Sequence, residues 1–522
     1  MKKLKQLTIV LLLLAVTFGL IPAPIMAQEG AACDADVIVQ GDDWLSKIAD
    51  KFLGDPLAFP AIVEATNAAA AADESYAQID NPDIIEIGWK LCIPAAEAAQ
   101  ATLGENAVAA PTDGTVLTVW DIWTRGVDGQ TIETLDREFE AAHPGVTINR
   151  VVKSFDDMKA TAQLALSSDD GPDVAQINQG LSDMVALVQA GLLTDLTPYW
   201  QKYNWSERLA APLAARNSVV GDGSAYGQGN IYGMAPTAEF IGVFYNKEKF
   251  ASAGVEVPTT FAEFEAALET FKAAGETPIM YGNLDGWPAI HTYGELQNVY
   301  NPDQTYLDNF IYGRGDVSFD QPGNVEAAAK LQEWVEKGYF TQDFNGIGYD
   351  DIWPLFSNGE GAMYITGTWI SANLLEGSSA DQIGFFLVPP LEAGAAKPIV
   401  AGTSTAYTIR KSSPNQDLAA EYIDWMMSDR AMELWLEAGL VPVAPVESAS
   451  IEPDTLMADM TQAWDQILAT NSMGHYLDWA TPTFYDTITA SLQELQALRI
   501  TPEEFVQQLQ QDYAAYLAEK QQ

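Results

Sequence analysis

Residues 116–120, Val-Leu-Thr-Val-Trp, form an apolar run that the segment Asp121-Ile122-Trp123-Thr124 follows directly. Apolar side chains then recur at helical spacing through 132–139, and His143-Pro144-Gly145 ends that helix. A second apolar run over 146–152 completes a strand–helix–strand unit. Such a unit is typical of a largely parallel sheet with helices against its faces, so it predicts an α/β fold.

The same alternation continues along the chain from residue 115 onward. Further strands are predicted at 173–177, 278–281, 362–365, 383–388 and 405–409, and the tail after Asp417 is helical. Thr260 and Glu263 form a capping-box pattern at the start of one intervening helix. About four hundred residues exceed what one such sheet holds, so we expect residues 115–522 to form two lobes.

Charge and composition exclude several classes of protein. The 522 residues include 26 Lys and Arg against 72 Asp and Glu, which gives a formal net charge of −46. Nucleic acids and anionic membranes repel such a surface, so neither is expected as a partner. Hydrophobic residues make up 48% of the chain, which is enough for packed cores and excludes a wholly disordered chain.

The N-terminus has the pattern of an export signal. Met1-Lys2-Lys3-Leu4-Lys5 is basic, an apolar run extends over 7–21, and small residues precede Gln28. This order predicts a signal peptide over residues 1–27, cleaved near Ala27, with an uncleaved N-terminal anchor as the alternative. We therefore expect an extracytoplasmic protein, in a periplasm or associated with a cell wall.

The chain has two cysteines, Cys33 and Cys92. Outside the cytoplasm an even pair favours a disulfide. A lipid on Cys33 is the alternative, but Gly30-Ala31-Ala32 lacks the bulky residue usual at a lipoprotein site. Lipidation would also leave Cys92 without a partner, so we predict the disulfide.

Residues 33–95 are predicted to form a small domain of strand, two helices and strand. About sixty residues give a marginal core, which a disulfide between the strands would stabilise. Two motifs decide its type: Val39-Gln40-Gly41-Asp42 near the start and Ile87-Gly88-Trp89-Lys90-Leu91 near the end. They resemble a LysM domain. The Ala-rich stretch over 96–114 is interpreted as a linker.

The LysM resemblance implies binding of peptidoglycan or another glycan that contains N-acetylglucosamine. It places the glycan contacts at Gly41, Asp42, Asp43 and Trp44. Asp43 stands where the family usually has a hydroxyl residue, and this extra acid is expected to weaken glycan binding. A domain that only spaces or caps the larger unit is the alternative.

A second set of motifs runs through the rest of the chain in the order of another family. The set includes Phe139-Glu140, Gly171-Pro172-Asp173-Val174, Ala190-Gly191-Leu192-Leu193, Ile231-Tyr232-Gly233-Met234, Phe244-Tyr245-Asn246-Lys247, Gly367-Thr368-Trp369 and Ala438-Gly439-Leu440-Val441-Pro442. It resembles the extracellular solute-binding proteins of carbohydrate ABC importers, the family that includes maltose-binding protein. The resemblance implies a periplasmic-binding-protein fold, a sugar ligand and a membrane permease as partner.

In this family two lobes close around the ligand, and the sequence suggests where this chain would bend. Hinge segments are predicted at 233–237 and 401–405, between the expected lobes. Ligands of open α/β sheets lie beyond the carboxyl ends of the strands, and sugars need flat aromatic faces with planar polar groups. Residues that follow predicted strands are therefore the candidate contacts.

Seven residues are predicted to bind the sugar. Trp123, Trp287 and Trp369 are proposed as stacking platforms, Asp156, Gln179 and Asn283 as hydroxyl partners, and Tyr232 as a contact beside the crossing. A structural role is the alternative for each, because Trp often packs in cores and polar loop residues often close turns. Trp334 and Trp425 are interpreted as core, whereas Trp479 fits either role.

Catalytic and metal motifs are missing from the sequence. The histidines, His143, His291 and His475, lie far apart, and no Gly-x-Ser-x-Gly elbow occurs. We therefore predict a monomeric binding protein without metal or cofactor, not an enzyme. A cell-wall hydrolase or a glycan-binding protein without a transport role is the alternative, since LysM domains often accompany such enzymes.

Overall fold

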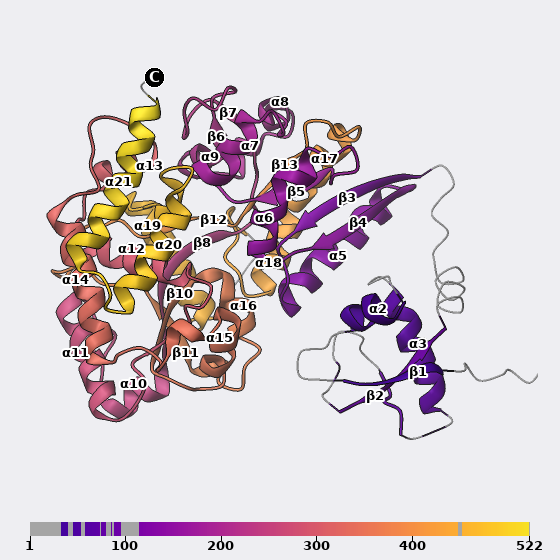
Figure 1. The fold of residues 1–522 in the computed structure, drawn as a ribbon, viewed down its shortest axis with the longest axis horizontal. Helices are drawn as coiled ribbons and strands as arrows, with labels where there is room; N and C mark the ends of the chain where they lie inside the picture. Colours follow the sequence, from indigo (N-terminus) through magenta and orange to yellow (C-terminus); the bar gives the residue numbers. More distant parts are fainter. Residues whose placement is uncertain are drawn as a thin grey trace, which may run out of the picture. The chain divides into compact units, whose positions relative to one another are not determined.

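The computed structural model (Figure 1) describes residues 33–39, 45–53, 58–71, 73, 75–79, 85, 88–95, 114–446 and 451–520. The chain divides into two compact units, Met1–Gly114 and Thr115–Gln522. The predicted signal peptide over 1–27, its cleavage near Ala27 and the linker over 96–113 lie outside the described residues. The glycan contacts predicted at Gly41, Asp42, Asp43 and Trp44 also lie outside them.

The small unit has the predicted order of elements. Strands β1 (Cys33–Ile38) and β2 (Lys90–Pro94) pair antiparallel, and the helices α2 (Leu45–Leu53) and α3 (Phe59–Ala70) lie between them in the chain. Ile48, Ile62 and Leu91 are buried in its core. The predicted disulfide is confirmed: it joins Cys33 to Cys92, whose Cα atoms are 5.2 Å apart.

In the large unit, a first sheet has the strand order β13-β5-β3-β4. Its strands are β3 (Thr115–Asp121), β4 (Val146–Val152), β5 (Val174–Ile177) and β13 (Ala406–Ile409). β3 is parallel to both β4 and β5, as the opening strand–helix–strand unit predicts, whereas β13 runs antiparallel to β5. The helix α5 (Gly126–Ala142) connects β3 to β4, and α6 (Phe155–Leu166) connects β4 to β5.

The second sheet is centred on the long strand β8 (Ala238–Asn246). β10 (Met363–Gly367), β11 (Ile383–Phe386) and β12 (Ala401–Thr403) all pair antiparallel with β8, and β9 (Ile279–Met280) pairs in parallel with β10. This sheet is therefore mixed, and the expectation of largely parallel sheets is wrong here. The reason is that β8 arrives directly from the first sheet, so it runs against the strands that pair with it.

The remaining elements are mostly helices that cover the two sheets (Figure 1). They are a π-helical turn at Leu181–Val185 with α7 (Ala186–Gln189), then α8 (Thr197–Lys202), α9 (Ala211–Arg216), the hairpin β6 (Ser218–Val219) and β7 (Asn230–Ile231), α10 (Lys247–Ala253), α11 (Phe261–Ala273), α12 (Pro288–Tyr300), α13 (Gln304–Ile311), α14 (Pro322–Lys337), α15 (Tyr349–Ser357), α16 (Ser371–Leu374), α17 (Gln416–Met426), α18 (Asp429–Glu437), α19 (Leu456–Thr470), α20 (Phe484–Gln496) and α21 (Pro502–Lys520). The capping box predicted at Thr260 and Glu263 is confirmed at the start of α11. Of the helices described, none has the length and hydropathy of a membrane span.

The two segments predicted as hinges both connect the two sheets. Met234 bridges to Tyr407 of the first sheet, and four residues later β8 begins in the second. Ser404 and Thr405 join β12 to β13 in the opposite direction. The Ser404 backbone N–H donates to the Thr237 carbonyl at 3.0 Å, so the two crossings are hydrogen-bonded to each other. Their bending remains a prediction.

Candidate functional site

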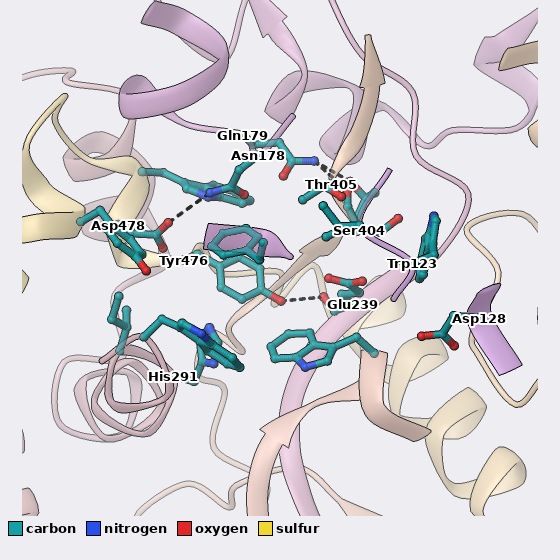
Figure 2. Close-up of a pocket in the computed structure, with 18 of the residues that line it drawn as sticks. Trp123, Asp128, Asn178, Gln179, Glu239, His291, Ser404, Thr405, Tyr476 and Asp478 are labelled. Atoms are coloured by element: carbon teal, nitrogen blue, oxygen red, sulfur yellow. Dashed lines mark hydrogen bonds between the residues drawn. The ribbon is translucent and has the colours of Figure 1, made fainter. Parts of the chain in front are cut away.

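A pocket opens where strand ends of the first sheet approach the second sheet and its helices. It contains about 900 Å³ of empty space, counted with its open mouth, which is within the range of small-molecule sites. Its lining comprises Ile122, Trp123, Arg125, Asp128, Phe155, Asn178, Gln179, Glu239, Trp287, Ile290, His291, Trp369, Thr403, Ser404, Thr405, Tyr476, Asp478, Trp479 and Tyr485. Figure 2 shows that polar and aromatic side chains converge on this space from several elements.

One side of the pocket, here called the strand-end wall, consists of Ile122, Trp123, Asn178, Gln179 and Thr405. Ile122 and Trp123 follow β3, Asn178 and Gln179 follow β5, and Thr405 precedes β13. These are neighbouring strands of one sheet. Parallel β3 and β5 end at the same edge, and antiparallel β13 begins there. The wall therefore forms at the edge where α/β sheets usually bind ligands.

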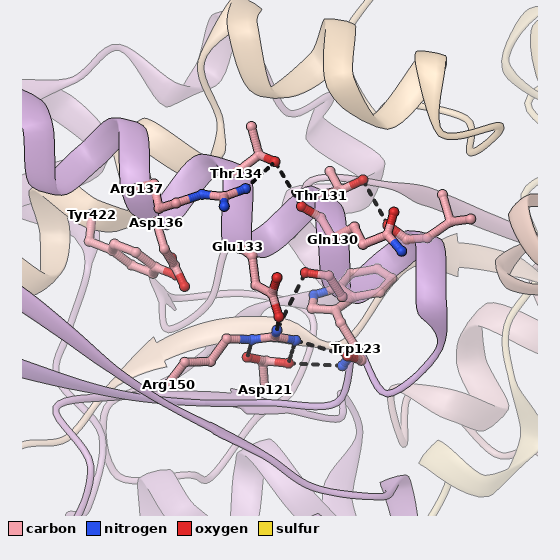
Figure 3. A network of polar contacts seen from close by, with 12 residues as sticks. Asp121, Trp123, Gln130, Thr131, Glu133, Thr134, Asp136, Arg137, Arg150 and Tyr422 are labelled. Carbon is pink, nitrogen blue, oxygen red and sulfur yellow. Dashed lines mark hydrogen bonds and ion pairs between the residues drawn. The ribbon is translucent and has the colours of Figure 1, made fainter. Parts of the chain in front are cut away.

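A buried ion pair fixes Trp123 in the strand-end wall (Figure 3). The Arg150 guanidinium donates to both carboxylate oxygens of Asp121, at 2.6 and 2.9 Å, and also to the Trp123 carbonyl at 2.8 Å. Asp121 in turn accepts from the Trp123 backbone N–H at 2.9 Å. The Trp123 ring lies 4.6 Å from that of Trp435, and its Nε1–H donates to the Tyr407 hydroxyl. Trp123 is therefore held rigidly, with little of its ring exposed.

Gln179 is also held by hydrogen bonds within the protein. Its amide nitrogen donates to the Thr403 hydroxyl and the Ser404 carbonyl, both at 3.0 Å. Gly180 follows it at φ 93°, and a Cβ there would lie 2.7 Å from Trp479, so only glycine permits this close approach. Gln179 thus links the end of β5 to the crossing between the sheets, while its side chain lines the pocket.

The aromatic residues of the pocket other than Trp123, Phe155 and Tyr485, here called the aromatic wall, are Trp287, His291, Trp369, Tyr476 and Trp479, of which Trp479 also adjoins Gly180 next to the strand-end wall. Their rings pack against one another: the His291 ring lies 5.1 Å from Trp369 and 5.6 Å from Tyr476, and Tyr476 lies 5.1 Å from Trp479. Trp369 is oriented by a 2.8 Å hydrogen bond to the Tyr349 hydroxyl. Trp287 and Trp369 are only half-buried, so parts of their faces remain open to a ligand.

Three of the seven residues predicted as contacts are not among the lining residues. Asp156 is exposed on α6, next to Phe155, whose ring does line the pocket. Asn283 is fully buried: its amide nitrogen donates to Asn345 and Gln496, and its oxygen accepts from the Ala289 N–H in the first turn of α12. Tyr232 is buried directly after β7. The other four, Trp123, Gln179, Trp287 and Trp369, come together in the pocket.

Burial shifts the carboxyl groups and the histidine of the pocket toward their neutral forms. Burial, assisted by the nearby charge of Asp128 and opposed by Arg125, raises the pKa of Glu239 to about 8. Burial also raises the pKa of Asp128 to about 7, against the opposing effect of Arg125, and that of Asp478 to about 6. It lowers the pKa of His291 to about 3, so this ring is uncharged near neutral pH.

Several polar atoms of the pocket are buried and have no hydrogen-bond partner among the described residues. They are Asp128 Oδ1, His291 Nδ1, Ser404 Oγ, Thr405 Oγ1 and Arg125 Nε. Unpartnered buried polar atoms are costly, and a polar ligand would satisfy them. In the part of the chain that the structure describes, no group of three or more His, Cys, Asp or Glu side chains is placed to hold a metal ion.

Comparison with known proteins agrees with this geometry. The bacterial extracellular solute-binding protein family matches residues 123–433, which is more than half of the chain and includes both walls in part. The chain belongs to this family. Its members bind solutes and are not enzymes, which confirms the prediction of a non-enzymatic protein.

Individual relatives of this solute-binding protein are distant in sequence but similar in fold. The multiple sugar-binding protein of Streptococcus mutans is 24% identical over 322 residues, covering 60% of this chain and 72% of that protein. A chitin oligosaccharide binding protein has a TM-score of 0.68 at 23% identity, over 78% of this chain and 100% of that one. A structure from work on xylan utilization by Caldanaerobius polysaccharolyticus has a TM-score of 0.67 at 25% identity, over 76% and 99%.

Sequence reasoning missed most of the ionisable residues in this solute-binding protein's pocket. Asp128 and His291 lie inside helices, and Glu239 lies inside a strand, so no turn or strand end marked them. Trp479, which the sequence left between core and cleft, lines the pocket. One signal could have identified Glu239. It is a charged residue within an apolar run, and it lies two residues beyond the predicted hinge.

Proposed function

We propose that this chain is the substrate-binding protein of an ABC importer, and that it captures a sugar or oligosaccharide between its two lobes. The observation that carries the proposal is the pairing of the two walls across one pocket. The aromatic wall offers ring faces to the C–H faces of a pyranose, and the unpartnered polar atoms can meet its hydroxyl groups. Similar proteins are named for binding multiple sugars or chitin oligosaccharides.

Within this proposal, the sugar contacts are Trp123, Gln179, Trp287 and Trp369. Asp156 would reach a longer ligand at the mouth, since its neighbour Phe155 lines the pocket. Tyr232 and Asn283 would act indirectly, through the crossing and through the start of α12. The loaded protein would then dock on a membrane permease supplied by other chains.

A thermal-shift experiment on the mature chain tests this function. The panel would hold neutral mono- and oligosaccharides of increasing length together with amino acids and polyols as non-sugar controls. A sugar at about a hundred times its dissociation constant adds roughly 2.7 kcal/mol to the free energy of unfolding, an easily visible shift. A shift with sugars alone supports the proposal. Shifts with the non-sugar controls alone, or with nothing, contradict it.

For the small unit, the proposal is attachment to cell-wall glycan through a LysM domain. Its support is the β-α-α-β order, the antiparallel pairing of β1 with β2, and the disulfide between Cys33 and Cys92. This attachment would hold the exported protein, after removal of its signal peptide, near the permease. Co-sedimentation of the mature chain with purified peptidoglycan, competed by soluble N-acetylglucosamine oligomers, is the expected result. A chain that stays in the supernatant would contradict the attachment.

A further inference from the structure

Two carboxylates, Asp128 and Glu239, line the same part of the pocket from different elements. Asp128 lies in α5 and Glu239 in β8, and Figure 2 shows both carboxylates on the Trp123 side of the pocket, away from Asp478. They are close enough for the charge of Asp128 to raise the pKa of Glu239. Asp128 is 1% exposed, and its Oδ1 has no hydrogen-bond partner among the described residues.

The positive charges near this pair also interact with other carboxylates. Arg125 is the one cation among the lining residues, and it pairs with Asp350 at 3.0 Å while its guanidinium lies 5.6 Å from the centre of the Tyr349 ring. Its field lowers the pKa of Asp128, yet that pKa still rises to about 7 because of burial. Lys159, beyond Asn178, forms a 2.6 Å ion pair with Asp183. Arg125 lowers the pKa of both Asp128 and Glu239, but it shares its single charge with Asp350 as well, which leaves a place for a second positive charge when both carboxylates ionise.

The remaining surroundings of the pair favour a positive charge. Aromatic faces attract cations through the ring quadrupole, and Trp123, Trp287 and Trp369 all line this pocket. A neutral hydroxyl could share a hydrogen bond with either carboxyl group, but it would supply no positive charge to either of them once ionised. A protonated amine carries several N–H donors and one full charge, so it can bind both carboxylates and satisfy Asp128 Oδ1.

We infer that the carbohydrate captured in this pocket carries a protonated amino group, bound between Asp128 and Glu239. The inference rests on the proposed sugar-binding function and specifies its substrate class. Besides this pair, the ionisable groups that line the pocket are Arg125 just before α5, His291 from α12, Tyr476 and Asp478 from the segment before α20, and Tyr485 from α20. His291 stays neutral, so it does not compete with the amine for the carboxylates.

The test is isothermal titration calorimetry of the mature chain with matched ligands. Glucosamine oligomers, their N-acetylated counterparts and neutral glucose oligomers of the same length differ at one substituent. We expect the amino sugar to bind at least tenfold more tightly than the other two. Binding at pH 6.5 should also release between one and two protons, measured in buffers of different ionisation enthalpy, because Glu239 and Asp128, with pKa values of about 8 and about 7, must both ionise to hold the amine. Neutral sugars should release none.

Variants separate the pair from a general effect of charge. Glu239→Gln and Asp128→Asn should each reduce the preference for the amino sugar, measured as the ratio of its affinity to that of the neutral sugar, tenfold or more. Glu376→Gln is the matched control, because Glu376 is exposed, lies outside the lining and raises the pKa of the same Asp128. It should retain the preference.

Each outcome decides between the two proposals. Equal or tighter binding of the neutral sugars, or a preference that survives both substitutions, overturns the amine inference and leaves sugar capture standing. If no sugar of the three series binds, sugar capture itself fails and the inference fails with it. Thermal unfolding of each variant without ligand shows whether a lost preference reflects binding rather than loss of the fold.

Discussion

The two walls of the pocket are built in different ways. The strand-end wall comes from adjacent strands of one sheet. Its Trp123 backbone is fixed by hydrogen bonds with Asp121 and Arg150, and its Gln179 side chain donates to Thr403 and Ser404. The aromatic wall comes from α12, the end of β10 and the segment before α20, and its rings are fixed by packing against one another. Hydrogen bonds therefore fix the residues of the strand-end wall, whereas the packed rings of the aromatic wall provide surface for a ligand.

This difference separates stability from affinity. Trp123 is 5% exposed and its ring packs on Trp435, so it supports the fold more than it contacts a ligand. Trp287 and Trp369 are half-buried, and part of each face is available. Changes in the strand-end wall should act mainly on the free energy of unfolding, whereas changes in the aromatic wall should act mainly on binding.

The largest expected effect is on the strand-end wall. Asp121→Ala removes the buried partner of Arg150 and leaves its charge without compensation, which should lower the free energy of unfolding by about 3–5 kcal/mol. Urea unfolding followed by tryptophan fluorescence measures this. Glu133→Ala is the control, because Glu133 is exposed and lies 3.8 Å from the same guanidinium. A loss under about 1 kcal/mol is expected there, and equal losses would break the distinction between the two contacts.

Three carboxylates, Asp128 and Glu239 in the pocket and Asp136 outside it, should make stability depend on pH. Folding raises the pKa of Asp128 and Asp136 to about 7 and of Glu239 to about 8, so the folded chain holds more protons than the unfolded chain. The stability that protonation gives is complete below pH 4 and is lost as pH rises through these values. Below pH 6.5 the buried histidines have the opposite effect on stability, because they are protonated in the unfolded chain and neutral in the folded chain. Above pH 6.5 they are neutral in both states and no longer oppose this trend.

We expect the free energy of unfolding of the ligand-free chain to fall by on the order of 2–3 kcal/mol between pH 6.5 and 8.5. Denaturant titrations at fixed ionic strength measure it. Glu239→Gln should reduce the slope by removing the group with the highest of these pKa values. A stability that is constant or rises over this window would contradict the electrostatics of the pocket.

The next effect concerns the aromatic wall. Trp287→Ala and Trp369→Ala should each weaken sugar binding by about 10- to 100-fold, because stacked ring area is lost, with a smaller change in unfolding than Trp123→Ala. Calorimetric titration and thermal unfolding measure the two effects on the same samples. Trp200→Ala, on half-buried α8 surface outside the lining, should leave affinity unchanged. A Trp200 variant that binds as weakly as the other two would remove the special role of this wall.

The smallest effect should come from the Thr405 hydroxyl, which is buried and lacks a partner among the described residues. Thr405→Val keeps the shape of the side chain and removes that unsatisfied group, so stability should be unchanged or slightly higher. Sugar affinity should fall by about fivefold, roughly the net contribution of one hydrogen bond. A stability loss above about 1 kcal/mol would show that Thr405 serves the fold instead.

Much of the fold follows from local sequence patterns. The strand–helix–strand unit from residue 116, the capping box at Thr260 and the pairing of Cys33 with Cys92 each depend on short-range signals, and all three are present. The direction of β8 was not predictable in this way. Its antiparallel pairing depends on where the chain crosses between sheets, and the periodicity of a strand carries no direction.

The residues of the site show the same difference between features set by local sequence and features set by long-range packing. Trp123 and Gln179 follow strands, and position in the chain was enough to place them in the pocket. Asn283 follows a strand as well, but its side-chain oxygen accepts a hydrogen bond from the first turn of α12 and its amide nitrogen donates to Gln496. The contact with Gln496, far along the chain, cannot be read from local sequence. Asp128, Glu239 and His291 lie in regular elements whose facing direction only the assembled lobes determine.

Hydrogen–deuterium exchange of the mature chain, with and without the best-binding sugar, tests whether the ligand binds between the two walls. Binding there should slow exchange in segments 121–125 and 178–180 of one wall, 476–479 of the other, and 403–405 at the crossing. Slower exchange confined to residues 33–95, or no change in these four segments, would contradict it.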